Sequence, residues 1–193
     1  MKVTSGLYRS RKLKSPQGRA VRPTSEIVKQ ALFNMLAPTV RGARVLELFC
    51  GTGQLGIEAL SNGAESVVFV DSARESAALT RENLHALGLE AEVLQLPFEQ
   101  AVAVLERRGA RFDLILADPP YAGGFYEQLQ ALAAQSGVLR PGGVLVMEFD
   151  TNLPPQFSAA FTVLRQKSYG RRSLVLLQKK EESDETNHLS REL

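Results

Sequence analysis

Short apolar runs alternate with longer amphipathic stretches through most of the chain. The short runs are rich in Val, Ile and Leu, whereas apolar residues in the longer stretches recur at helical spacing. Continuous apolar runs are typical of parallel strands that helices cover on both faces. The pattern therefore predicts a doubly wound α/β sheet. The predicted strands are 44–49, 66–70, 91–96, 112–117 and 143–149, and the predicted helices are 54–62, 73–87, 98–108 and 124–135.

The first 40 residues depart from this alternation. Residues 1–22 are rich in Gly and Arg and alternate only weakly, which predicts an extended arm or hairpin that projects from the main body. A helix is expected to follow, because the next apolar residues again recur at helical spacing. Thr24 or Ser25 would cap its start, and Pro38 would end it.

The end of the chain predicts a hairpin in place of a further crossover. Residues 161–167 and 172–178 form two strand-like runs with Tyr169 and Gly170 between them. The last residues, "EESDETNHLSREL", have the composition of a disordered tail. The chain thus divides into a basic arm at 1–23, one α/β domain at 24–180 and a disordered acidic tail at 181–193.

Basic residues gather at the two ends of the chain, although the formal net charge is only +2. Residues 1–44 carry ten Lys and Arg against the single acid Glu26, and residues 165–180 carry six with no acid. Such a cluster is either solvated surface charge or a phosphate-binding footprint, and finding one at each end favours the second interpretation. The candidates for contact with RNA phosphates are Arg9, Arg11, Lys12, Lys14, Arg19, Arg22, Arg171 and Arg172.

The composition excludes several classes of protein. Cys50 is the single cysteine, so no intramolecular disulfide can form, and no Cys/His cluster indicates a metal site. The N-terminus is polar and basic, and no apolar run approaches the ~20 residues of a membrane span. We expect a soluble, cytoplasmic protein without a metal.

A glycine loop follows the first predicted strand, in the sequence "ARVLELFCGTGQLGIEAL". Glycines let the backbone turn sharply and approach a ligand, and the helix that follows presents unpaired N–H groups. Asp71 ends the next predicted strand, where its carboxylate can accept both hydroxyls of a ribose. The combination indicates a nucleoside cofactor. Because Gly51, Gly53 and Gly56 also fit the dinucleotide fingerprint, both NAD and S-adenosylmethionine stay open at this point.

Glu47 favours the methyl donor over NAD. This acid lies inside the first predicted strand between Leu46 and Leu48, so we expect it beneath the glycine loop. There it would attract the ammonium group of the methionine moiety, whereas it would repel the pyrophosphate of NAD.

The fourth predicted strand ends in Asp118-Pro119-Pro120-Tyr121. Methyl transfer to an exocyclic amino group is difficult because the nitrogen lone pair is delocalised into the ring. The Asp118 carboxylate and the Pro119 carbonyl can accept the two amino hydrogens and aim the lone pair at the methyl carbon. Proline fixes φ and offers no competing N–H. Tyr121 provides a ring on which a base can stack, a contact of about 1–3 kcal/mol.

These motifs resemble those of class I S-adenosylmethionine-dependent methyltransferases. Over about residues 2–178 the chain is similar to the bacterial 16S ribosomal RNA guanine-N2 methyltransferases of the small subunit, through "VLELFCGTGQLGIEALSNGA", "DLILADPPY" and "YGRRSLVLL". The specific part of the resemblance is N-terminal and consists of Gly6, Arg11, Leu13, Arg22-Pro23-Thr24 and Leu32-Phe33-Asn34.

The resemblance implies a fold, a reaction and a partner. The fold is a Rossmann-like, seven-stranded, mostly parallel sheet with an antiparallel last strand and a small N-terminal β-hairpin arm. The reaction transfers one methyl group from S-adenosylmethionine to N2 of a guanine, guanine-966, of 16S rRNA. The arm would engage the small ribosomal subunit, either as naked rRNA or as an assembled particle, and the enzyme would act as a monomer.

Two positions depart from the pattern of that family. Ser10 stands where members often carry Gly, which would alter the turn of the arm. Many related methyltransferases have an Asp after the third strand for the adenine amino group, but here the sequence is Leu96-Pro97-Phe98. Adenine recognition is then expected to rely on backbone atoms and on packing by Phe98.

The candidate site residues fall into two groups. The catalytic group is Asp118, Pro119, Pro120 and Tyr121. The cofactor-binding group is Glu47, Phe49, Gly51, Gly53, Asp71, Ser72, Phe98 and Asp118.

Three alternatives remain from the sequence. An adenine-N6 methyltransferase would use the same Asp-Pro-Pro-Tyr chemistry, although no stretch is long enough for an added target-recognition region. An NAD-dependent oxidoreductase would use the glycine loop but offers no catalytic Lys, Ser/Tyr pair or well-placed His. A noncatalytic RNA-binding protein would use only the basic ends. For the methyltransferase, the guanine must leave its stack, so we expect a target in a loop or bulge.

Overall fold

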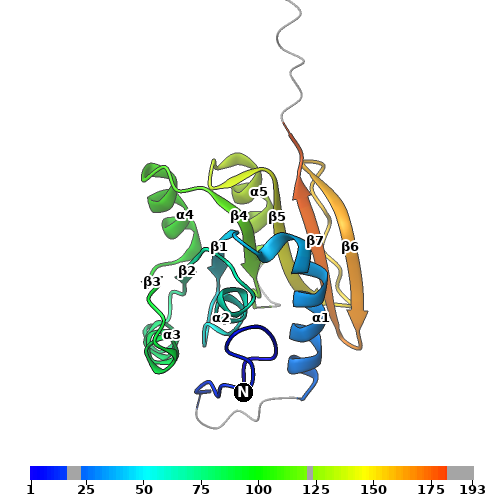
Figure 1. The fold of residues 1–193 in the computed structure, drawn as a ribbon. Coiled ribbons are helices and arrows are strands. Elements are labelled where there is room, and N and C mark those ends of the chain that lie inside the picture. Colours follow the sequence, from blue (N-terminus) through cyan, green and yellow to red (C-terminus); the bar gives the residue numbers. More distant parts are fainter. Residues whose placement is uncertain (17–22, 121–123, 182–193) are drawn as a thin grey trace, which may run out of the picture.

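The computed structural model describes residues 1–16, 23–120 and 124–181 and is built around a seven-stranded sheet (Figure 1). The strand order is β3-β2-β1-β4-β5-β7-β6. β7 runs antiparallel to β5 and β6, and the other paired strands are parallel. The predicted fold, a mostly parallel sheet with an antiparallel last strand, is confirmed. The strands are β1 (Arg44–Leu48), β2 (Ser66–Val70), β3 (Glu92–Leu94), β4 (Phe112–Ala117), β5 (Leu139–Asp150), β6 (Phe161–Tyr169) and β7 (Arg172–Lys179).

Helices cover both faces of the sheet. Successive residues of a strand point to opposite faces. Accordingly, Val45 belongs to the same core cluster as Leu32 of α1, whereas Leu46 belongs to the cluster of Val102 of α4 and Leu129 of α5. The first cluster, which also takes in residues of α2 and α3, defines the α1–α3 face, and the second defines the α4–α5 face. The helices are α1 (Pro23–Val40), α2 (Gln54–Ser61), α3 (Arg74–Leu87), α4 (Phe98–Arg107) and α5 (Phe125–Gln135).

The first helix differs from expectation at both ends. It begins at Pro23, a residue suited to a first helical turn, so Thr24 and Ser25 lie within the helix and not at its cap. It continues through Pro38 to Val40, so the prediction that Pro38 ends the helix was wrong. Proline removes one backbone donor, but Val40 is only 2% exposed, and its packing in the core holds the last turn.

The last two strands form the predicted hairpin. β6 and β7 pair antiparallel on either side of Gly170, whose φ of 62° suits the turn. β7 inserts between β5 and β6, so β6 is the edge strand. Residues 182–193, on which the prediction of a disordered tail falls, lie outside the described residues. Among the helices that the structure describes, none combines the length and apolarity needed to cross a membrane.

The N-terminal arm packs on the body instead of projecting from it. Lys2 and Lys12 form an antiparallel bridge, which agrees with a hairpin-like path. However, Val3 and Leu13 are buried in the same core as α1 and α2, with exposures of 1% and 6%, and Figure 1 shows the arm lying against α2. The prediction of a projecting arm was therefore wrong. Residues 17–22, the rest of the predicted arm, lie outside the described residues.

Candidate active site

A cavity of about 480 Å³ opens at the carboxyl ends of the central parallel strands. In open α/β sheets this edge is where ligands bind. Five of the residues predicted to bind the cofactor lie in its wall, together with Leu96, Pro97, Pro120 and Phe125. The five are Phe49, Asp71, Ser72, Phe98 and Asp118.

The glycine loop joins β1 to α2 beside this cavity. Gly51 and Gly53 have φ of 55° and 74°, values that side chains disfavour. A Cβ at Gly53 would also lie 2.8 Å from Cγ2 of Thr80. The Gly51 N–H donates to one carboxylate oxygen of Asp71 (2.9 Å), and the Ala73 N–H donates to the other (2.9 Å). The loop and the end of β2 are thereby fixed to each other, and Asp71 is held at the cavity wall.

Glu47 lies beneath the loop, where the sequence places it. Its side chain is buried, and its Oε2 accepts the Gly56 N–H of α2 at 2.9 Å. Burial raises the pKa of Glu47 to about 8, and repulsion from Asp118 and Asp71 adds to that rise. A Cβ at position 56 would lie 2.7 Å from Oε2 of Glu47 and 2.4 Å from the Phe69 ring. The third glycine of the fingerprint is thus required for α2 to approach β1.

Three phenylalanines form an apolar wall of the cavity. The ring of Phe49 lies 5.1 Å from that of Phe98 and 5.5 Å from that of Phe125, centroid to centroid, in tilted and edge-on geometries typical of aromatic clusters. Phe98 begins α4 and Phe125 begins α5. Phe125, which was not among the predicted site residues, also lies in the cavity wall.

Asp118 follows the last residue of β4 and lies between two cavities. It contributes to the wall of the large cavity and to that of a smaller one, of about 30 Å³, on the α1–α3 face. Burial and, to a smaller extent, repulsion from the nearby Glu148 raise the pKa of Asp118 to about 7, although Arg172 acts to lower it. Pro119 is buried and Pro120 is exposed. Tyr121 lies outside the described residues, so its predicted stacking role stays a prediction.

Sequence reasoning missed one acid at this site. Glu148 of β5 lines the small cavity beside Asp118 and pairs with Arg172 of β7 at 2.9 Å. Arg172 was predicted to contact RNA phosphates, but the structure places it in the wall of this cavity. The available signal was an acid within the apolar run 143–149, the same signal that identified Glu47.

Comparison with known proteins assigns the chain to a family. The family model described as conserved hypothetical protein 95 matches residues 1–178. The chain belongs to this family. Its relatives include YlbH of Bacillus subtilis, 34% identical over 183 residues that cover 93% of this chain and 100% of YlbH. They also include the ribosomal RNA small subunit methyltransferase D of Haemophilus influenzae, 30% identical over 172 residues, 88% of this chain and 89% of that one.

Solved structures agree with this assignment. YhhF of Escherichia coli superposes with a TM-score of 0.82 at 29% identity, covering 94% of this chain and 99% of that one. A more distant structure, the methyltransferase SMU.776 complexed with SAH, shares the fold with a TM-score of 0.65 at 17% identity, covering 82% of this chain and 50% of that one. The chain has the fold of the class I S-adenosylmethionine-dependent methyltransferases.

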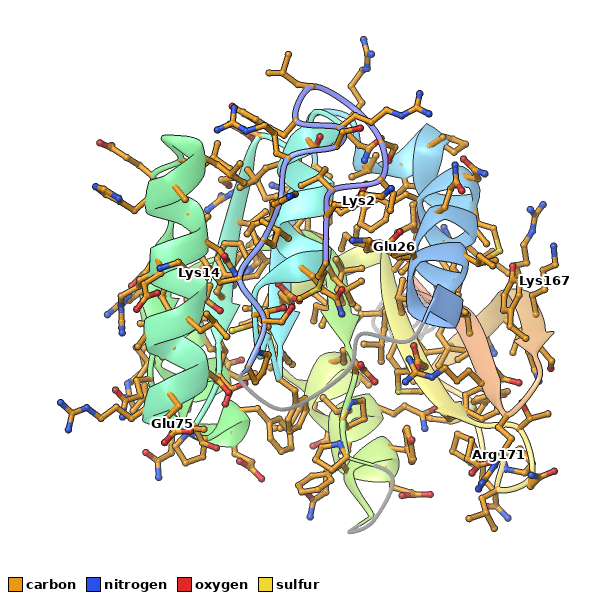
Figure 2. The ribbon with its side chains drawn as sticks, turned by 90° about the horizontal axis from the view of Figure 1, so that it is seen from below. Lys2, Lys14, Glu26, Glu75, Lys167 and Arg171 are labelled. Atoms are coloured by element: carbon orange, nitrogen blue, oxygen red, sulfur yellow. The ribbon has the colours of Figure 1, made fainter. Side chains whose placement is uncertain are left out.

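The described residues among the predicted RNA contacts lie on two separate parts of the molecule. Figure 2 shows Lys14 of the arm far from Arg171 of the β6–β7 turn. Arg9, Arg11 and Lys12 are exposed on the arm, and Lys14 pairs with Glu82 at 2.9 Å. The Arg171 side chain is 82% exposed while it pairs with Asp150. Arg19 and Arg22 lie outside the described residues.

A buried ion pair attaches the arm to the body. The Glu58 side chain of α2 is fully buried and pairs with Lys29 of α1, at 3.2 Å. The same carboxylate accepts the backbone N–H and hydroxyl groups of Thr4 and Ser5, at 2.7–3.0 Å. Lys29 in turn donates to the Lys2 carbonyl at 2.7 Å. Glu58 and Lys29 therefore each bind the start of the arm in addition to pairing with one another.

Asn83 of α3 connects the other end of the arm to the glycine loop. Its side chain is buried, its amide oxygen accepts the Lys14 N–H at 2.7 Å, and its amide nitrogen donates to the carbonyls of Lys14 and Thr52, at 3.2 and 2.9 Å. Backbone groups at both ends of residues 1–16 therefore have partners in the body. These contacts hold the arm in place on the body, with its basic side chains exposed to solvent.

We expect Glu58→Ala to destabilise the protein by about 3–5 kcal/mol, because it leaves the Lys29 ammonium buried without its anion and removes the acceptor of Thr4 and Ser5. Urea unfolding followed by circular dichroism measures the change. Glu82→Ala is the matched control, since the exposed Lys14–Glu82 pair should contribute under about 1 kcal/mol. Equal effects of the two replacements would show that the buried pair does not anchor the arm.

Proposed function

We propose that this protein methylates the exocyclic N2 amino group of a guanine, guanine-966, in the 16S rRNA of the small ribosomal subunit. The coarser statement, an S-adenosylmethionine-dependent rRNA methyltransferase, follows from the family, whose relatives are named ribosomal RNA small subunit methyltransferases. The observation that carries the finer proposal is the position of Asp118, whose carboxylate lies in the wall of the cofactor-sized cavity and beside a second cavity on the α1–α3 face.

The residues of the large cavity fit S-adenosylmethionine. Its volume of about 480 Å³ lies in the range of small-molecule sites. Asp71 would accept the ribose hydroxyls, and the wall formed by Phe49 and Phe98 would cover the adenine. Glu47, buried under the loop, would favour the positively charged methionine end. S-adenosylmethionine supplies an electrophilic methyl group when it is bound.

The Asp118 segment has two tasks toward the guanine amino group. The carboxylate and the Pro119 carbonyl accept its two hydrogens, which orients the nitrogen lone pair for attack. When the nitrogen takes the methyl group, its new N–C bond forms as the carbon–sulfur bond breaks, and one N–H proton must leave. A carboxylate whose pKa is raised to about 7 is well matched to receive that proton near neutral pH.

The alternatives from the sequence differ in their support. The oxidoreductase gains none, because the relatives carry methyltransferase names. An adenine-N6 methyltransferase would use the same acceptor pair. Identification of the methylated product distinguishes it from a guanine-N2 methyltransferase.

Analysis of the methylated nucleoside tests the proposal. Small subunits from cells that lack the gene are incubated with the protein and S-adenosylmethionine, and the RNA is digested and analysed by mass spectrometry. We expect N2-methylguanosine at one position, mapped by primer extension. N6-methyladenosine, or no product from a protein that binds S-adenosylhomocysteine, would refute the proposal.

The rate of methylation should depend on the ionisation of Asp118. Its pKa is raised to about 7, and the neutral acid cannot accept both a hydrogen bond and the departing proton. With S-adenosylmethionine saturating, kcat/KM for RNA should rise about tenfold per pH unit at low pH and level off by about pH 7, since the bound cation lowers the same pKa. A rate that is constant between pH 5 and 8 would contradict this role.

A further inference from the structure

The wall of the small cavity beside Asp118 contains three charged residues that the mechanism above does not use: Glu148, Arg172 and Lys29. Glu148 of β5 pairs with Arg172 of β7, and Lys29 of α1 pairs with Glu58. Gln54 and apolar residues of α1 and α2, such as Leu32 and Leu55, complete the wall. Its volume is about 30 Å³, which is water-sized, so no more than the polar edge of a base would enter it.

The sheet register explains why these side chains meet. Ala117 pairs with Met147, and both belong to the α4–α5 face. The next residue on each strand, Asp118 on β4 and Glu148 on β5, therefore points to the opposite, α1–α3 face. On β7, Arg172 alternates with Leu174, which belongs to that same face. Across β4, β5 and β7 the order is thus carboxylate, carboxylate, guanidinium.

The three groups interact electrostatically at close range. Arg172 and Glu148 are 2.9 Å apart, and their side chains are 33% and 12% exposed. The raised pKa of Asp118 reflects burial first and then repulsion from Glu148, and Arg172 acts in the opposite direction. Two partly buried carboxylates on adjacent strands repel one another, so their proximity calls for cationic or hydrogen-bond-donating partners. Arg172 supplies one such partner, through Oε1 of Glu148, and Lys29 is a second cationic residue of the same wall.

The base edge of guanine has the complementary order of groups. Along that edge, N2 and N1 carry hydrogens to donate and O6 is an acceptor. Adenine offers an N6 amino group next to an N1 lone pair, which a carboxylate would repel. We propose that Glu148 and Arg172 read the target base as guanine, with Glu148 accepting the N1 hydrogen and Arg172 donating to O6, while Asp118 accepts from N2. This inference rests on the proposed function, because it assigns the specificity of that same site.

Base analogues test whether Glu148 and Arg172 recognise the base edge of guanine, without any change to the protein. In 2-aminopurine and 2,6-diaminopurine the 2-amino group remains, but N1 is an acceptor. With the target guanosine of an rRNA fragment replaced by either analogue, kcat/KM of the wild-type protein should fall about 100-fold or more, because Glu148 would face a lone pair. Comparable rates for guanosine and both analogues would overturn the inference while leaving N2 methylation intact. No methylation of guanosine at all would instead sink the proposed function.

Replacement of Glu148 should relax this discrimination. In Glu148→Gln the amide can donate to an N1 lone pair, so the rate with guanosine should fall while the preference for guanosine over 2-aminopurine shrinks at least tenfold. Arg172→Met should lower the rate with guanosine more than that with 2-aminopurine, which lacks O6. Glu127→Gln, at an exposed position of α5, is the matched control and should keep the wild-type preference. An equal loss on both substrates in Glu148→Gln would assign Glu148 to stability alone and overturn its role in reading the base.

Discussion

Asp118→Ala should lower the single-turnover rate of methylation by about 10³-fold and leave the dissociation constant of S-adenosylhomocysteine within a few-fold of wild type. The variant loses the acceptor that orients the amino nitrogen and takes up its proton, and each of these contributions is typically 10²-fold or more. Cofactor affinity should persist because the ribose, adenine and ammonium contacts are assigned to other residues. Rapid-quench methylation assays and calorimetry measure the two quantities.

Asp71→Asn is the matched comparison for this prediction. It makes a similar change at the wall of the same cavity, but Asp71 is assigned to the ribose and not to the reacting atoms. We expect weaker binding of S-adenosylhomocysteine with a much smaller loss of rate at saturating cofactor. If Asp118→Ala retains activity within a few-fold of wild type, the acceptor mechanism is wrong.

Replacement of Arg9, Arg11 and Lys12 together by Ala should weaken binding to rRNA at least tenfold near physiological salt. The three side chains are exposed on an arm that the body holds in place, so their charges are available to phosphates. The plot of log affinity against log salt should also become shallower by about 2–3, because each phosphate that is no longer neutralised reduces the slope by about 0.7–0.9. Binding to small-subunit RNA over a series of salt concentrations measures both effects.

A second triple variant controls for the removal of charge. Arg107, Arg108 and Arg111 are also exposed, but they lie at the end of α4 and just before β4, at the amino edge of the sheet. Their replacement by Ala removes the same net charge and should leave the salt slope nearly unchanged. Equal slopes for the two triple variants would show that the arm does not contact phosphates.

The fold was largely predictable because buried parallel strands leave a strong local signal. In β1, for example, Val45 and Leu46 are both apolar because they face opposite helical layers of the fold. The position of the arm was not predictable in this way. Its partners, Glu58 and Ser61, are more than 50 residues away in the sequence, and the polar residues that hold it resemble those of a solvated segment.

The candidate site was likewise predictable only in part. Glu47, Asp71 and Asp118 could be predicted because each acid interrupts or ends an apolar strand, and parallel strands bring such ends to one edge. Glu148 also interrupts an apolar strand, but its role depends on which residues the neighbouring strands place beside it. Arg172 looks like a surface cation in the sequence, and only the insertion of β7 beside β5 brings it to the cavity. Strand order, which sets these contacts, is a property of the whole chain.

The most direct test of the central claim is a crystal structure of the protein with S-adenosylmethionine bound. The account predicts that the transferable methyl carbon lies within about 6 Å of the Asp118 carboxylate, the distance spanned by an in-line nitrogen and one hydrogen bond. A methyl group directed away from Asp118, with no room for an amino group between them, would contradict the account.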